Sequence, residues 1–126
     1  MGSFGQALLG RRWDYPRMAD EPDDTVELPA AAGSFANEEP AVWNAYGEFG
    51  QACSEAGPLD DETRRLVKLA LAVGAESEGA VHSHVRRGLD EGLAPGELEH
   101  VATLAMPTLG FSQGMAARSW IQDLTE

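Results

Sequence analysis

The chain has 126 residues, the size of one ordinary domain, and 43% of them are hydrophobic, which is enough for a packed core. The formal net charge of −12 argues against nucleic acid as a partner, because such binding depends on lysine and arginine side chains that neutralise phosphates. No apolar stretch approaches the roughly 20 residues of a membrane-spanning helix, and the N-terminal segment lacks the apolar run of a signal peptide. We therefore expect a cytoplasmic protein without membrane contact.

The acidic excess lies in the first half of the chain. Residues 1–62 carry 13 acidic and 3 basic side chains, whereas residues 63–126 carry 8 and 6. Residues 1–37 also contain three prolines and show no sustained hydrophobic period. This pattern predicts an extended or partly disordered acidic N-terminal arm over residues 1–37, followed by a helical domain over residues 38–126.

The first helix is expected from Pro40 to about Ala56. A proline is tolerated at a helix start because its missing N–H would have had no partner there, and Gly57-Pro58 ends the helix. The apolar positions at helical spacing are Val42, Tyr46, Phe49 and Cys53. This spacing predicts that they form the buried face, with the only cysteine of the chain as a buried structural thiol. A single cysteine also excludes an intrachain disulfide.

Four more helices are expected. The second begins after the N-cap residue Asp60 and closes at Gly74, and the third covers about residues 76–89. The fourth begins at Pro95 and is kinked or ended by Pro107, and the fifth begins near residue 112. No segment alternates with period 2, so the fold class is all-α, with about five helices joined by short links.

The segment EGAVHSHVRRGL, residues 78–89, contains two histidines. Residues two apart on a helix point about 200° apart, so His82 and His84 cannot bind one metal ion together. Glu78, His82 and Arg86 are spaced one turn apart and form either an exposed stabilising row or, through the first two, part of a metal site. Two ligands are fewer than the three or four that zinc usually takes.

Two other features have open interpretations. His84 has the small and apolar helix neighbours Ala80, Val81 and Gly88, so we expect it to be at least partly buried, as a hydrogen-bonded core residue or as a functional one. His100 follows Glu97 and Glu99 and is expected to be partly exposed and paired with a carboxylate. Four apolar residues of the last two helices are expected to be ordinary core, a pocket lining or a subunit contact: Leu104, Pro107, Phe111 and Met115.

Three segments, in order and with short spacers, carry a resemblance: PLDDETRRLVKLALAVG, EGAVHSHVRRGLDEG and APGELEHVATLAMPTLGF. They resemble the carboxymuconolactone decarboxylase and alkylhydroperoxidase-D-like family over roughly half the chain. The resemblance implies an alkylhydroperoxidase-D-like helical bundle that forms homo-oligomers, commonly trimers or hexamers.

The resemblance also assigns individual positions. His84 falls on the family's histidine, whereas Ser77 and Ala80 fall where the redox branch carries its two cysteines. Arg65 falls where that branch carries an acid, and Glu62, one turn earlier, could partly substitute. A thiol peroxidase needs a thiolate nucleophile, so the resemblance does not imply thiol peroxidase activity for this chain.

The decarboxylase branch, which removes a carboxylate from a small anionic lactone, needs no cysteine. The resemblance then implies acid/base chemistry at His84 with no cofactor or metal. We expect Arg65 or Lys68 of the second helix to face the same space and bind the anion. The basic residues of the second and third helices are alternatively solvated faces. Two other functions stay open: a redox protein without thiol cycling, and a non-catalytic or metal-binding oligomer that uses Glu78 and His82 at its interfaces.

Overall fold

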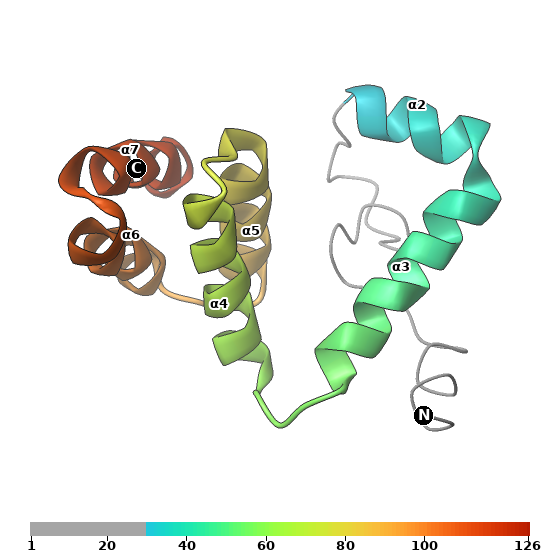
Figure 1. The fold of residues 1–126 in the computed structure, drawn as a ribbon, viewed down its shortest axis with the longest axis horizontal. Helices are drawn as coiled ribbons and strands as arrows, with labels where there is room; N and C mark the ends of the chain where they lie inside the picture. Colours follow the sequence, from blue (N-terminus) through green and yellow to red (C-terminus); the bar gives the residue numbers. More distant parts are fainter. Residues whose placement is uncertain (1–29) are drawn as a thin grey trace. The chain divides into compact units, whose positions relative to one another are not determined.

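The computed structural model describes residues 30–126, and all the regular structure in that part of the chain is helical. The helices are α2 (Ala30–Glu38), α3 (Pro40–Glu55), α4 (Asp61–Gly74), α5 (Glu78–Asp90), α6 (Pro95–Leu109) and α7 (Phe111–Thr125). The predicted all-α class is therefore confirmed. The chain divides after Pro58 into two compact units, whose described parts are residues 30–58 and 59–126 (Figure 1).

Helix α2 lies in a stretch for which the sequence predicted no regular structure. It begins within the Ala30–Ala32 run, and alanine has the highest helix propensity of all residues. The Ser34 hydroxyl donates to Glu38 one turn later, at 3.2 Å. The rest of the predicted arm, residues 1–29, lies outside the described residues, and the domain boundary at residue 38 stays a prediction.

The first unit has a different buried face from the predicted one. Trp43 of α3 is buried and makes an edge-on contact with Phe35 of α2, with ring centroids 6.4 Å apart. The other buried positions of α3 are small: Gly47, Gly50, Ala52 and Ser54. The predicted face is wrong, because Val42, Tyr46 and Phe49 are about half exposed and Cys53 is exposed. Large apolar residues were taken to mark the packed side of this helix, whereas its buried positions other than Trp43 are small residues.

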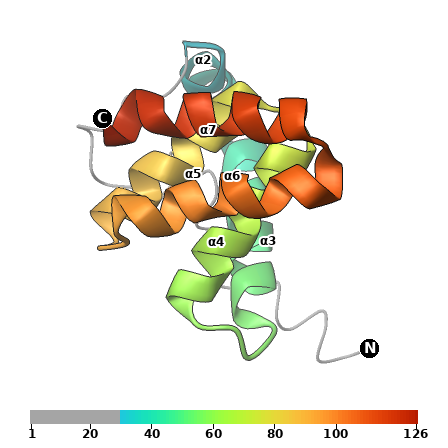
Figure 2. The same cartoon turned by 90° about the vertical axis from the view of Figure 1, so that its left-hand side faces the viewer.

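The second unit consists of two layers of two helices. Helices α4 and α5 pack side by side, as do α6 and α7, and the α6–α7 pair lies across the α4–α5 pair (Figure 2). Every helix contributes to one core, whose fully buried larger side chains are Leu69, Leu98, Ile121, Val73, Val81 and Val85. None of the described helices is long and apolar enough to cross a membrane.

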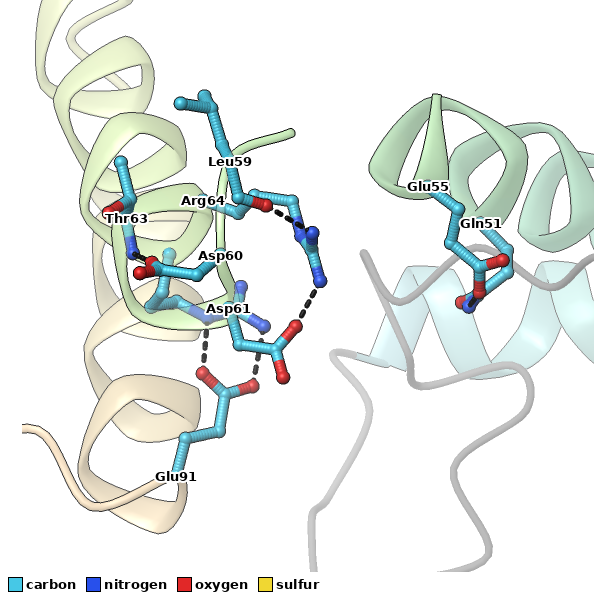
Figure 3. A network of polar contacts seen from close by, with 9 residues as sticks. Gln51, Glu55, Leu59, Asp60, Asp61, Thr63, Arg64 and Glu91 are labelled. Carbon is cyan, nitrogen blue, oxygen red and sulfur yellow. Dashed lines mark hydrogen bonds and ion pairs between the residues drawn. The ribbon is translucent and has the colours of Figure 1, made fainter. Parts of the chain in front are cut away.

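The beginning of α4 follows the sequence prediction. Asp60 is its N-cap, and its Oδ1 accepts a hydrogen bond from the Thr63 backbone N–H at 2.8 Å. That bond, a second one from the Thr63 side chain and the charge of Arg64 hold the pKa of Asp60 below its usual value (Figure 3). At the other end of the helix, the side-chain amide of Gln113 on α7 donates to the Val73 carbonyl at 3.2 Å.

The ends of α4 and α5 share one turn geometry. In each, the second residue after the helix has a positive φ, Glu76 at 55° and Gly92 at 98°. The following N–H of Ser77 bonds to the Ala72 carbonyl, and that of Leu93 bonds to the Gly88 carbonyl. These are the backbone bonds of a Schellman motif, in which glycine is the preferred residue at the positive-φ position.

The junction of α6 and α7 decides between alternatives that the sequence left open. Pro107 lies inside α6, which continues to Leu109, so this proline does not end the helix, and the kink stays a prediction. The apolar residues Leu104, Phe111 and Met115 are 59%, 69% and 42% exposed. They are therefore not ordinary core of the described chain, which leaves the expected pocket lining or subunit contact.

Candidate functional site

Helices α4 and α5 bring three polar side chains together. Arg65 of α4 is 2% exposed and His84 of α5 is 3% exposed, and Nη1 of Arg65 lies 2.8 Å from Nδ1 of His84. The other edge of the guanidinium donates to both carboxylate oxygens of Glu91, from Nε at 2.9 Å and from Nη2 at 2.8 Å (Figure 3). The side chains form a continuous chain from Glu91 through Arg65 to His84.

Backbone geometry holds both ends of this chain of contacts. Glu91 is the residue directly after α5, where the Schellman motif around Gly92 fixes its backbone. Gly88 lies one turn after His84, and a Cβ atom there would meet Leu98 at 2.9 Å and Cγ of Arg65 at 3.5 Å. The missing side chain of Gly88 thus lets the Arg65 stem and Leu98 approach α5 one turn after His84.

The hydrogen bond to Arg65 selects one form of the imidazole. A guanidinium has only N–H donors, so Nδ1 of His84 must be the acceptor. In the neutral ring the proton then lies on Nε2, by inference from the hydrogen-bond partner. The arrangement therefore favours a neutral imidazole with its proton on Nε2. Arg65 orients this ring, and Glu91 in turn holds Arg65.

The structure places the other predicted site residues as follows. Lys68 lies one turn after Arg65 on α4 and is half-buried. Glu62 is exposed, and the acid that meets Arg65 is Glu91 instead. Arg87 is 7% exposed, so the interpretation of these bases as a solvated face does not hold for Arg65 and Arg87.

Glu91 was missed by reasoning from the sequence. It lies just past the end of a helix, in a segment that reads as an acidic turn before Gly92. A signal was nevertheless present, since a buried arginine requires a paired carboxylate. Arg65 on the inner side of an amphipathic helix creates that requirement, but nothing in the sequence indicates which of the 21 acids meets it.

The positions of the redox branch's two cysteines have a structural role here. Ser77 is the N-cap of α5, and its hydroxyl accepts a hydrogen bond from the backbone N–H of Ala80 at 3.3 Å. Neither residue supplies a thiol, and the only cysteine of the chain, Cys53, lies on α3 in the other unit. The His84 site of the second unit therefore contains no thiol of its own.

The two remaining histidines lie away from this site. His82 is on the side of α5 that meets α7, where its Nε2 lies 2.9 Å from Oδ2 of Asp123. His100 is exposed on α6, and its pairing with a carboxylate stays a prediction. The acids beside it have other partners, since Glu97 accepts from the Ala94 N–H and Glu99 accepts from the hydroxyl of Thr125, at 2.9 and 2.8 Å.

Comparisons with known proteins identify the family of the chain. Residues 40–123 match the Carboxymuconolactone decarboxylase family. A protein of Haemophilus influenzae described as "Uncharacterized protein" is 31% identical over 65 residues, which cover 52% of this chain and 58% of that protein. The chain thus spans little more than half the length of this relative, and no solved structure matches it. Because the family match covers most of its length, the chain belongs to the carboxymuconolactone decarboxylase family.

Proposed function

We propose that the chain catalyses decarboxylation or a related proton transfer on a small carboxylated molecule, with His84 as the acid. The observation that carries the proposal is the hydrogen bond between Arg65 Nη1 and His84 Nδ1. It engages Nδ1 of a buried imidazole, which makes the opposite ring nitrogen, Nε2, the one that acts on the substrate in this proposal. A neutral imidazole in such an arrangement is an effective donor to an oxygen that becomes negative during the reaction.

In the reaction, the C–C bond to the carboxylate breaks and CO₂ leaves. The electron pair moves into the remaining molecule as an enolate, whose carbon then takes up a proton from water. Nε2–H of His84 donates to the enolate oxygen as its charge develops, and the Arg65 cation beside Nδ1 stabilises the partial negative charge that the ring then gains. Arg65 is a positioning residue in this scheme, because its Nε, Nη1 and Nη2 are directed at Glu91 and His84.

The charges around the site favour an anionic substrate. The Arg65–Glu91 pair is close to neutral, while Arg87 is buried one turn after His84 and Lys68 is half-buried one turn after Arg65. These two cations carry the kind of N–H donors that bind a carboxylate. Since only 3% of His84 is exposed, we expect substrate binding to be accompanied by local opening of the side chains that cover the ring.

The test is consumption of a small carboxylated lactone with measurement of released CO₂. His84→Gln keeps a side chain of similar size but removes the imidazole, and it should lower turnover by about 10²–10⁴-fold. His100→Gln is the matched control, because it removes an exposed histidine from the same unit. Unchanged turnover in His84→Gln, or no turnover of any carboxylated lactone by the unaltered protein, would contradict the proposal.

We also propose that the protein self-associates. Exposed apolar residues support this: Phe111 and Met115 lie one turn apart on α7, and Tyr46 and Phe49 lie on α3, all at least 42% exposed. Light scattering should give a multiple of 13.5 kDa, with a trimer or hexamer expected for this family. Phe111→Asp should lower that mass, and a monomer at micromolar concentration would contradict the proposal.

The cytoplasmic location expected from the sequence stays a prediction.

A further inference from the structure

A second polar cluster lies on α5, away from the Arg65–His84 contact. Glu78 and His82 are one turn apart at the start of α5, and Asp123 comes from the end of α7. Nε2 of His82 lies 2.9 Å from Oδ2 of Asp123 and 3.9 Å from Oε2 of Glu78. One nitrogen or oxygen atom from each of the three side chains can be chosen so that all lie within 4.8 Å of one another.

Both carboxylates of this cluster approach the same ring nitrogen. A single N–H can donate well to only one of them, and the contact to Glu78 is correspondingly long. A metal ion bound to the lone pair of that nitrogen would instead bind both carboxylates at once. The arrangement joins two helices and includes an imidazole, so it is more than a group of acids on one surface.

The distances suit a small divalent ion. Zinc lies about 2.0–2.2 Å from nitrogen and oxygen ligands, which in a tetrahedral site puts those ligands about 3.4 Å from one another. The observed separations of 2.9 and 3.9 Å lie on either side of that value. The Glu78 and Asp123 side chains are 57% and 51% exposed, so both can adjust without disturbing the core.

We propose that Glu78, His82 and Asp123 bind one divalent transition-metal ion of the zinc class, which ties the start of α5 to the end of α7. The imidazole ligand favours zinc and its neighbours over magnesium and calcium, which prefer oxygen ligands. Two carboxylates balance the charge of the ion, and water completes its coordination. Because His82 and His84 are two residues apart on one helix, this site is separate from the proposed catalytic one.

The experiment is calorimetric titration of the metal-free full-length protein with Zn²⁺ alone. We expect one ion per chain, with affinity at least about 10-fold weaker in His82→Gln and in Asp123→Asn, since even residues outside a ligand shell contribute that much. His100→Gln and Cys53→Ser are matched controls that remove another exposed histidine and the exposed thiol. Both should bind zinc as the unaltered protein does.

A second measurement guards against variants that fail to fold. Zinc should raise the midpoint of thermal unfolding of the unaltered protein, because binding to the folded state stabilises it, and at the same zinc concentration should raise that of the cluster variants by less. If His82→Gln is unfolded by circular dichroism, Glu78→Gln takes its place, since that side chain is mostly exposed. No stoichiometric zinc, equal affinity in the cluster variants, or loss of binding in either control would overturn the proposal.

Discussion

Nη1 of Arg65 lies 2.8 Å from Nδ1 of His84, and both residues are buried although each can carry a charge. The contact joins α4 to α5 across 19 positions of the sequence. Arg65 stays charged at any ordinary pH, so its burial depends on the bidentate pairing with Glu91. The stability of the helix pair and the orientation of the imidazole thus depend on the same guanidinium.

The first prediction concerns the cost of leaving that guanidinium unpaired. Glu91→Ala should lower the free energy of unfolding by about 2–4 kcal/mol, because a buried cation then lacks its counter-ion. Adding Arg65→Met should recover part of the loss, since the second change removes the buried charge. Urea unfolding of the single and double variants, at one protein concentration, measures both values. If the double variant is less stable than Glu91→Ala alone, the prediction is wrong. The unpaired charge of Arg65 would then not be the cause of the loss in Glu91→Ala.

The second prediction concerns the close contact of α6 and α7 at Gly114. A Cβ atom there would lie 2.3 Å from Cγ of Met106 and 3.1 Å from the Ala102 carbonyl oxygen. The methionine side chain can move but the backbone oxygen cannot, so Gly114→Ala should cost about 1–3 kcal/mol. The control Gly96→Ala, also in a helix, meets nothing within 4 Å and should be neutral or slightly stabilising. Equal unfolding midpoints for the two variants would contradict this view of the interface.

Much of the fold was predictable because its signals are local. Asp60 accepts the bond that an N-cap should accept, and Pro95 begins α6 as expected. The buried faces were harder to predict, since they depend on which elements meet. On α7 the sequence indicated Met115 as a core candidate, whereas Ala117 and Ile121 are fully buried.

The candidate site was predictable only in part for the same reason. Its histidine and arginine came from the resemblance to the family, and the structure places them in contact. The partner of Arg65 is 26 positions away, and Asp123 lies 41 positions from His82. Helical periodicity relates residues three or four apart and carries no information about pairs at such separations.

The third prediction concerns acid. Because the folded-state pKa of Asp60 lies below the ordinary value of 3.8, the ionised side chain stabilises the folded protein. That contribution is fully present above about pH 5 and is lost as the pH falls through 3.8 toward the lowered value. Thermal unfolding of the unaltered protein and of Asp60→Ala should therefore differ most near neutral pH, and the difference should shrink below pH 3.8. A difference that grows as the pH falls would contradict this assignment.

The last prediction concerns the turn between α4 and α5. Glu76 has a φ of 55° at a position where its counterpart after α5 is a glycine, Gly92. For a residue with a Cβ atom, this left-handed conformation lowers the stability of the folded state by roughly 1–2 kcal/mol. Glycine adopts the conformation without that strain but loses more chain entropy on folding.

Glu76→Gly should therefore raise the free energy of unfolding by about 0.5–1 kcal/mol, and Gly92→Ala should lower it by a similar amount or more. The chain carries a net charge of −12, so removing an acid could itself stabilise it. Glu76→Gln controls for this, because it removes the charge and keeps the Cβ atom. Urea unfolding of the variants separates the two causes. A gain in Glu76→Gln equal to that in Glu76→Gly would assign the effect to charge rather than to backbone strain.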